Sequence, residues 1–558
     1  MKRILASILA TVMILSCMTV FTFAETTNTQ TTDTAVWSGE IDYTWMVNDP
    51  DATEYTLTTP EQFAGFAALV SGGNKFAGKT VKLGADMILN TGNAENWATT
   101  APANIWTTIG NDKNPFQGIF DGQGHTISGM YVSTKVTSVD NLQQGLFAVL
   151  SSTSGDNINP TLRNFSLVNS YMDLKEAQKP GLVVGQLYTA QKDCVLTIEN
   201  IYAQGYIRSK VDTANGYAAG VTRVGGICGV VTVNNAEAQT VFRNLVSDVD
   251  ITALAPSTAN AGGLLAYLDS KGDITIENCV NLGDVTADTR QSGGLIAHSN
   301  GKAQLYISNC LNVGAVISTA DGDNGAEGGL IGRANKPEGT YNISNCITLA
   351  SACAPVIGLD MGVTINVTNC FGIAKNASNA YESSATEAQI KGANALTTIG
   401  ATYANGWRAF ENDWVLPVTA AIVMGKITLP ANRLAAVQET AVANGKIAVR
   451  LIGTVDGKNY KNVGFDVKVG SAAAEDKSAT SVFNSVAYGT GETAGKVGKS
   501  TYFANYVYGV ILPEISASGT VVIEATPYVT AANGTKTASA TTWVITYVDG
   551  VYTGTTTK

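Results

Sequence analysis

The sequence predicts an all-β protein in which a parallel β-helix with an N-terminal capping helix is followed by a C-terminal β-sandwich. Short runs of β-branched residues, bounded by Gly and Asn, recur through the middle of the chain and are typical of strands. One Asn-containing pattern recurs seven times. The chain of 558 residues is 45% hydrophobic but only 14% charged. Low charge suits stacked coils, in which like charges would lie side by side and repel.

The first 24 residues have the layout of a secretory signal peptide. Lys2 and Arg3 precede an apolar run that continues to Phe23, and Ala24 stands before a Thr-rich stretch. Cleavage after Ala24 removes two positive charges and changes the net charge from −10 to −12. A membrane anchor and a lipoprotein signal at Cys17 are the alternatives. We expect a secreted, extracellular protein, surface-associated or free, with no integral membrane segment after cleavage.

The overall charge and the histidine count exclude several functions. A net charge of −10 argues against a nucleic-acid partner, because such partners are bound mainly through phosphate contacts to Lys and Arg. Because the chain has two histidines, most His-rich metal sites are excluded. Acid–base chemistry would therefore depend on carboxylates, Tyr and Lys.

The central repeat consists of an apolar residue, a polar residue, Asn, and then an apolar residue or Cys. Its asparagines are Asn164, Asn200, Asn244, Asn278, Asn309, Asn345 and Asn369. A second element alternates with it, at Gly225-Gly226, Gly262-Gly263, Gly293-Gly294 and Gly328-Gly329. One strand from each element, joined by turns, makes one coil of a parallel β-helix. Asn suits the turn position, and stacked Asn amides can hydrogen-bond along the axis.

Four cysteines occupy the slot that follows the repeated Asn. They are Cys279, Cys310, Cys346 and Cys370. Other coils fill this slot with Phe or aliphatic residues, so we expect buried, reduced thiols that act as small hydrophobic side chains. Disulfides between neighbouring coils are an alternative with poor geometry, and a metal site is a further one. Cys194, Cys228 and Cys353 lie outside the slot.

A capping helix is predicted from Thr59, with Pro60 at its first position and Gln62 completing a capping box. The segment 73–80 that follows matches the phosphate-loop pattern G-x4-G-K-T. Phosphate binding by that motif needs a strand before the loop and a helix after it. Here the predicted helix comes first and a strand follows, so no nucleotide partner is expected.

A group of Gly- and aromatic-rich motifs gives the chain a family resemblance. They lie at 76–83, 106–110, 116–129 and 414–417. With the Gly-Gly and Asn repeats, they resemble those of bacterial cell-surface β-helix proteins with GLUG-type repeats, over about residues 36–418. The resemblance implies a right-handed β-helix on, or shed from, a bacterial surface, often within adhesins. Some relatives carry a zinc peptidase motif, His-Glu-x-x-His, which neither His125 nor His298 begins, so zinc peptidase activity is not expected.

Catalytic carboxylates are the next feature to consider, because parallel β-helices often act on polysaccharides. Acids such as Asp248, Asp250, Asp284 and Asp288 are expected mostly in connecting loops, without recurring at one repeat position. Asp321 and Asp323 resemble part of a calcium loop, which makes Ca²⁺ a weak cofactor candidate and a solvated turn the alternative. No other cofactor is expected. The turn 121–125 reads as a Gly-rich turn capped by the Asp121 side chain.

The segment after residue 431 reads as a separate module. Alternating strands are predicted at 447–455, 463–469, 502–512, 520–528 and 541–548, which suggests an Ig-like β-sandwich. The module is similar to terminal modules of clostridial-type exported proteins. Its aromatic residues form either a core or a sugar-stacking face. The predicted organisation is a signal peptide at 1–24, a capped β-helix at 25–418, a linker at 419–431 and the β-sandwich at 432–558.

The function predicted from these features is binding rather than catalysis. We expect a secreted or surface-associated, non-catalytic adhesion protein that presents loops on a rigid β-helix. Its expected partner is a cell-wall glycan, a host glycan or a surface protein. The alternative is a polysaccharide lyase or glycoside hydrolase, or a carbohydrate-binding protein.

Overall fold

The structure, a computed structural model, describes most of the chain from residue 35 onward. The described residues are 35–152, 158–212, 216–302, 304–320, 325–335, 338–349, 356–373, 383–390, 407–408, 416–417, 433–440, 445–455, 461–473, 475–478, 482–484, 506–512, 514–530, 536–539 and 541–558. The predicted signal peptide lies outside these residues. In them, no helix is both long and apolar enough to cross a bilayer.

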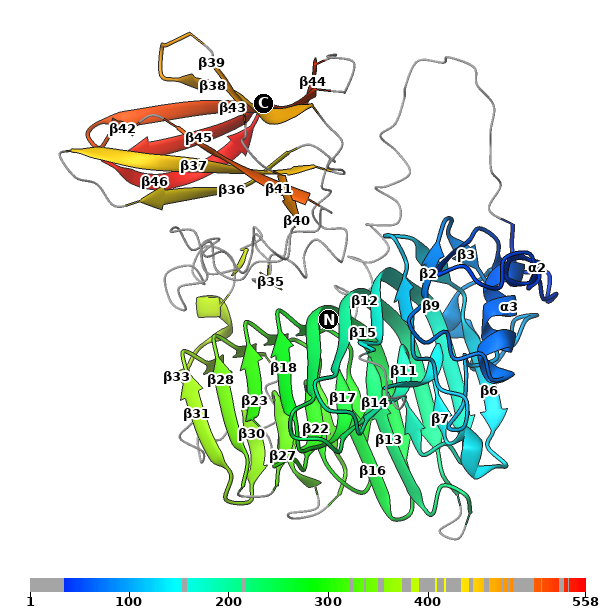
Figure 1. The fold of residues 1–558 in the computed structure, drawn as a ribbon. Helices are drawn as coiled ribbons and strands as arrows, with labels where there is room; N and C mark the ends of the chain where they lie inside the picture. Colours follow the sequence, from blue (N-terminus) through cyan, green and yellow to red (C-terminus); the bar gives the residue numbers. More distant parts are fainter. Residues whose placement is uncertain are drawn as a thin grey trace. The chain divides into compact units, whose positions relative to one another are not determined.

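The fold is all-β, and its first part consists of long parallel sheets (Figure 1). We call the largest sheet 1. Its strands are β1 (Glu54–Leu57), β2 (Thr80–Leu83), β3 (Met87–Ile88), β4 (Ile119–Asp121), β5 (Thr126–Ser128), β6 (Tyr131–Lys135), β9 (Thr161–Lys175), β12 (Val195–Lys210), β15 (Gln239–Leu254), β18 (Asp273–Glu277), β19 (Val280–Asn281), β20 (Val285–Ala287), β23 (Gln304–Ser308), β24 (Leu311–Asn312), β25 (Val316–Ser318), β28 (Thr340–Ser344), β29 (Ile347–Thr348), β31 (Thr364–Thr368), β32 (Phe371–Gly372) and β33 (Ser383–Ser384).

Two further parallel sheets complete each coil. Sheet 2 contains β8 (Phe147–Ser152), β11 (Val184–Thr189), β14 (Cys228–Val233), β17 (Leu265–Ser270), β22 (Ile296–Ser299), β27 (Ile331–Ala334) and β30 (Ile357–Asp360). Sheet 3 contains β7 (Gln143–Gln144), β10 (Lys179–Pro180), β13 (Val221–Gly225), β16 (Thr258–Gly262), β21 (Ser292–Gly293) and β26 (Glu327–Gly328). A single parallel bridge between Gly181 and Gly225 joins its two halves.

The chain visits these sheets in a fixed order. β13, β14 and β15 follow one another through sheets 3, 2 and 1, and β16, β17 and β18 repeat the path one coil further on. Equivalent strands of successive coils pair in parallel, as in β12 with β15. The prediction of parallel strands from the repeat is confirmed, and the architecture is β-helix-like.

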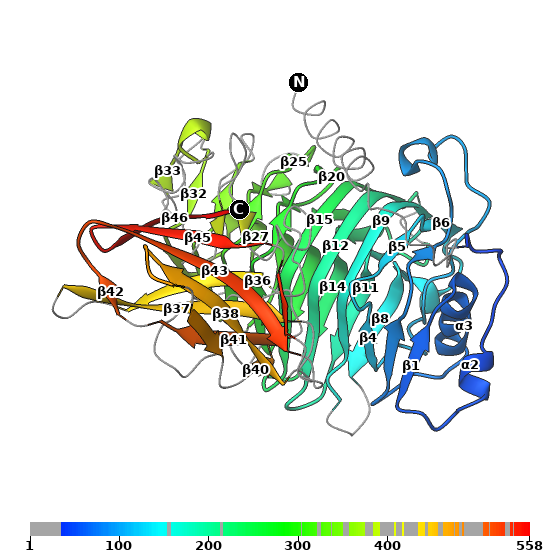
Figure 2. The same cartoon turned by 90° about the horizontal axis from the view of Figure 1, so that it is seen from above.

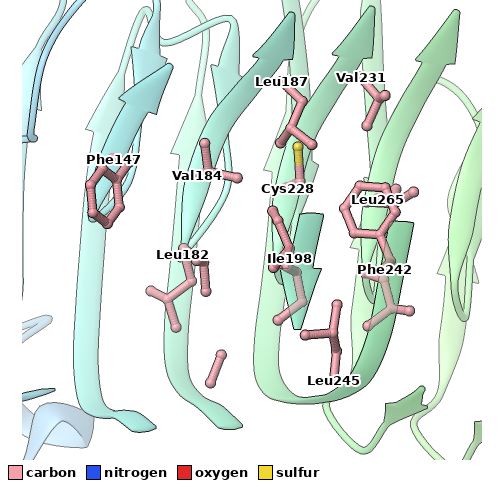
Figure 3. Close-up of a cluster of buried hydrophobic side chains, with 14 of the residues drawn as sticks. Phe147, Leu182, Val184, Leu187, Ile198, Cys228, Val231, Phe242, Leu245 and Leu265 are labelled. Atoms are coloured by element: carbon pink, nitrogen blue, oxygen red, sulfur yellow. The ribbon is translucent and has the colours of Figure 1, made fainter. Parts of the chain in front are cut away.

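The core lies between the sheets and is aliphatic and aromatic. Figure 3 shows Phe147, Val184, Cys228 and Leu265, which occupy equivalent positions on adjacent strands of sheet 2. All four side chains are buried. Facing rows of sheet 1, such as Ile198 beside Phe242, close the core from the other side.

Helix α3 (Pro60–Ser71) lies at the first strands of the parallel sheets (Figure 2). Its buried Phe66 packs against Phe76, Phe116 and Phe120. Thr59 caps it by accepting from the Gln62 amide, while Gln62 accepts from the amide of the residue before the cap. The described short helices are α2 (Thr44–Val47), η1 (Ala94–Asn96), η2 (Val139–Asn141) and η4 (Glu387–Ile390).

The C-terminal part contains two antiparallel sheets. One has β36 (Arg433–Thr440), β37 (Lys446–Val455), β40 (Val482–Asn484), β41 (Tyr506–Ile511) and β42 (Ile515–Ser516); the other has β38 (Asn462–Val469), β39 (Glu475–Ser478), β43 (Thr520–Thr530), β44 (Lys536–Ala538), β45 (Trp543–Val548) and β46 (Val551–Thr557). Residues from both sheets form one hydrophobic cluster. Tyr508 and Tyr547 belong to this cluster, and Tyr528 is buried beneath the Lys536 amine, so none of the three forms an exposed face. A short antiparallel pair, β34 (Trp407–Arg408) with β35 (Leu416–Pro417), lies between the two parts of the sequence.

Candidate functional site

The outward faces of sheets 2 and 3 carry the candidate site. Along sheet 2 the parallel register aligns Gln186, Val230, Tyr267, His298 and Arg333, one from each coil. The residues that follow the first three of these are Leu187, Val231 and Leu268, and they belong to the buried core. Because side chains alternate along a strand, the aligned row faces away from that core.

Sheet 3 contributes a second row beside the first. Lys179 aligns with Gln143, and Arg223 aligns with Asn260. The Gly181–Gly225 bridge places Lys179 opposite Arg223, two residues before the bridge on each strand. The two rows meet directly, since the Arg223 guanidinium carbon lies 4.2 Å from the centre of the Tyr267 ring.

A pocket of about 290 Å³ lies at the N-terminal end of these rows. Its charged lining consists of Lys75, Lys113, Lys179 and Asp112, and Tyr188 contributes a phenol. The Nζ atom of Lys179 donates to Oε1 of Gln186 at 2.9 Å. Lys113 pairs with Asp140 at 2.7 Å, so Lys75 and Lys179 against Asp112 leave the pocket cationic.

Lys179 is a pocket lysine whose pKa is lowered. Burial lowers its pKa, Arg223 lowers it further, and Asp112 opposes both effects. The Asp112 carboxylate is itself oriented by the Gln143 amide, which donates to it at 3.0 Å. A cation that is partly desolvated and faces other cations gains from an anionic partner.

The cationic groups continue beyond the pocket. We define the cationic strip as Arg223, Tyr267, His298, Arg290 and Arg333, all of which are half-buried. The His298 ring lies 5.1 Å from the Tyr267 ring, measured between centroids. Burial, followed by the charges of the three arginines, lowers the pKa of His298 to about 3, so its imidazole is neutral at pH 7.

Several nitrogens of the strip lack hydrogen-bond partners among the described residues. Nε of Arg223, Nε2 of His298 and Nε of Arg333 are buried and unpaired. The arginines that align on sheet 1 differ, because Arg163 donates to Asp121 at 2.8 Å and Arg243 donates to Glu199 at 2.5 Å. The Nε–H groups of Arg223 and Arg333 are buried donors without acceptors, which are costly, so an acceptor beside them would stabilise the protein.

The structure places the repeated asparagines in one column of turns. All seven have a left-handed φ, between 53° and 59°. Side-chain amide bonds run from Asn200 to Asn164 at 2.8 Å and from Asn244 to Asn200 at 2.8 Å. The same bonds link Asn278 to Asn244 at 3.1 Å, Asn309 to Asn278 at 3.3 Å and Asn369 to Asn345 at 2.8 Å.

Asp121 stands at the start of this column. Its carboxylate accepts from the Asn164 amide at 3.0 Å and from the backbone of Gln123 at 3.0 Å. His125, in the same turn, contacts the Asp86 carboxylate at 3.1 Å. The turn 121–125 therefore ends the asparagine ladder and holds its own backbone, as expected for a capped Gly-rich turn.

The cysteines of the slot are buried and free. Cys279, Cys310, Cys346 and Cys370 line the core, and Cys194 and Cys228 are also buried free thiols. Burial raises the pKa of Cys310 and Cys346, which keeps both thiols protonated. Cys353 lies outside the described residues.

The predicted carboxylates do not assemble into a site. Asp248 and Asp250 lie within β15 and not in connecting loops, which corrects our expectation. They sit there because β15 continues past the Asn turn, and Asp248 accepts from the Tyr202 hydroxyl at 2.9 Å. Asp321 and Asp323, the calcium candidates, lie outside the described residues. In the part of the chain that is described, no group of three or more His, Cys, Asp or Glu could hold a metal ion.

The lysine of the phosphate-loop pattern makes hydrogen bonds within the fold. The Lys79 amine donates to the carbonyls of Pro50 at 3.1 Å and of Ala52 at 2.5 Å. Helix α3 precedes the loop, and β2 follows it. The order needed for phosphate binding is therefore absent from this segment.

The class defined by these features is an all-β protein with β-helix-like parallel sheets and a cationic outer face. No protein-family model matches the chain, and no curated protein matches it. Among solved structures, it is similar to a "putative immunoglobulin A1 protease" from Bacteroides ovatus. The sequence identity is 20% and the TM-score 0.43, over 66% of this chain and 93% of the other. At this level the similarity assigns no activity to the chain.

Proposed function

We propose that this chain is a secreted or surface-associated, non-catalytic binding protein that holds an acidic group of a cell-wall or host glycan in the Lys179 pocket. The parallel sheets would be a right-handed β-helix of the GLUG-repeat kind, capped by α3. The C-terminal sheets, with their shared hydrophobic cluster, would be the Ig-like β-sandwich. The proposed boundaries remain 1–24, 25–418, 419–431 and 432–558.

The pocket is the observation that carries this proposal. It concentrates Lys75, Lys113 and Lys179 in a concave site, on a chain whose net charge is −10. Charge of one sign in a concave site attracts the opposite charge and raises its local concentration. In the neutral lining, the Tyr188 phenol is the group that can reach a sugar hydroxyl, because the Gln186 amide already bonds Gln143, Lys179 and Thr232.

Replacing Lys179 with Gln is expected to weaken binding of short acidic oligosaccharides about tenfold or more, because a charged hydrogen bond contributes about 1.5–3 kcal/mol. Isothermal titration with a di-galacturonate and with a heparin disaccharide would measure the loss. A neutral cellobiose arm tests whether charge is required. The matched control is Lys135→Gln, which removes one charge from an exposed side chain of β6. Equal binding by Lys179→Gln and the wild type would contradict the proposal.

A polysaccharide lyase is the second candidate, and the lowered pKa of Lys179 favours it. An amine that is neutral more often than an ordinary lysine can act as a base. In such a reaction, Lys179 would take the proton from the carbon that bears the uronate carboxylate. The bond to the glycosidic oxygen would break as a carbon–carbon double bond forms, and Tyr188 would protonate the leaving oxygen.

Incubation with pectate, alginate and glycosaminoglycans separates the two candidates. The non-catalytic proposal expects no increase in the ultraviolet absorbance of unsaturated uronate ends. An increase that disappears in Lys179→Gln and persists in Lys135→Gln would replace it with the lyase. Because the assay follows product and not binding, it remains informative if both variants still bind.

A further inference from the structure

The cationic side chains extend from the pocket along the direction in which the coils stack. Four successive strand pairings carry the outer row of sheet 2 from Gln186 in the pocket to Arg333. At roughly 4.8 Å between neighbouring strands, this spans about 19 Å. A ligand that fills only the pocket would leave the distal cations unused.

The members of the strip face one another and not separate regions of solvent. Arg223 lowers the pKa of Lys179 and also that of His298. The pKa of His298 is lowered further by Arg333 and Arg290. The electrostatic contacts are therefore continuous from the pocket to the fourth coil beyond it.

Few carboxylates balance these cations. Asp112 lies in the pocket, and Asp269 is close enough to Arg223 and the Tyr267 phenol to interact with both. Lys113 is paired with Asp140 at 2.7 Å. Among the described residues around the two rows, that leaves Lys75, Lys179, Arg223 and Arg333 against Asp112 and Asp269. The excess is positive on a protein that is acidic overall.

We propose that the pocket and the strip together bind one linear acidic glycan, laid along the stacking direction with acidic groups near Lys179, Arg223 and Arg333. This deepens the proposed function and depends on it. The buried, unpaired Nε–H groups of Arg223 and Arg333 would gain acceptors as these side chains adjust to the glycan. Asn300, which donates to the Tyr267 hydroxyl at 3.0 Å, has a second amide hydrogen for a sugar hydroxyl.

A glycan fits this surface better than a nucleic acid does. A single strand of nucleic acid also needs aromatic faces on which its bases stack, whereas the Tyr267 ring of the strip already carries the Arg223 guanidinium. Carboxylate and sulfate esters share the oxyanion chemistry that guanidinium groups bind in a bidentate manner. Uronate and sulfated polymers are therefore the two sources that the experiment must separate.

The test measures affinity against chain length. Wild-type protein is titrated with galacturonate oligomers and with heparin oligosaccharides, each as dimer, tetramer and octamer. An octamer that reaches the strip should bind at least about tenfold more tightly than the dimer, because its second contact is intramolecular. Whichever series shows this gain, galacturonate or heparin, identifies the kind of acidic polymer that the strip binds.

Arg333→Gln is expected to abolish the gain with length while leaving dimer affinity unchanged. Arg333→Lys should restore part of the gain, since it retains the charge but loses the bidentate contact. The matched control is Arg208→Gln, at an exposed position of β12 in sheet 1. Thermal melts establish that each variant is folded.

Each outcome separates the two proposals. If Arg333→Gln binds the octamer as well as the wild type does, the inference about the strip fails and the pocket stands. If Lys179→Gln binds the dimer as well as the wild type does, the proposed function fails. Displacement of the octamer by equimolar single-stranded DNA would overturn the assignment of the ligand class.

Discussion

Replacing Gly263 with Ala is expected to destabilise the parallel sheets by about 4 kcal/mol or more, or to abolish soluble expression. A Cβ atom at this position would lie 2.1 Å from the carbonyl oxygen of Gly294 and 2.3 Å from Cγ of Asn281. Backbone of the next coil cannot move away without breaking its own pairing. Urea unfolding followed by far-ultraviolet circular dichroism would measure the loss.

The same close contact recurs along the stack, which makes the prediction general. A Cβ on Gly226 would lie 2.2 Å from the carbonyl oxygen of Gly263, and one on Gly294 would lie 2.0 Å from that of Gly329. The control is Gly301→Ala, where the nearest atom, the Ser270 carbonyl oxygen, is 3.1 Å away. If Gly263→Ala and Gly301→Ala were equally stable, the close approach of successive coils at Gly263 would not require glycine there.

Replacing Asn244 with Ala is expected to cost about 3 kcal/mol. Its fully buried amide donates to Asn200 and accepts from Asn278. Loss of that amide leaves the buried Asn278 amide without its acceptor, at about 1–3 kcal/mol for an unsatisfied group, and removes the donor to the half-buried Asn200 oxygen. Alanine also tolerates φ of 55° poorly, a further cost of about 1–2 kcal/mol.

Asn244→Gly separates the two contributions, because glycine adopts positive φ without strain. Its loss in stability relative to wild type measures the side-chain bonds, and the difference between the Gly and Ala variants measures the backbone strain. Urea midpoints of the three proteins supply both values. An Ala variant no less stable than the Gly variant would refute the contribution of strain.

The repeat explains how much of the fold the sequence could predict. Asn164 and its six equivalents mark the turn because Asn tolerates left-handed φ and because its amide can bond to its own copy on the next coil. The second Gly of each pair, such as Gly263, marks a contact in which no side chain fits. Both signals follow from local chemistry that repeats, so they are visible in one sequence.

The candidate site could not be found in the same way. Tyr267, His298 and Arg333 hold one position, four residues after the second Gly of each pair, but they are three different residue types. Neither composition nor a motif search groups them. An alignment of the coils on the Gly-Gly pairs would have placed them in one column, whereas the pocket depends on Lys75 and Asp112 from loops outside the repeat.

The asparagine ladder also bears on how the protein would respond to mechanical load. Oδ1 of Asn309 has no hydrogen-bond partner among the described residues, so the bonded series from Asn164 ends there. A separate bond joins Asn345 and Asn369. The same two coils are joined by other side-chain bonds, between Tyr341 and Ser299 at 2.6 Å and from Asn335 to Asn300 at 3.0 Å. In a stack stabilised by nearest-neighbour interfaces, load along the stacking direction would therefore pass from the asparagine ladder to these bonds where the ladder is interrupted.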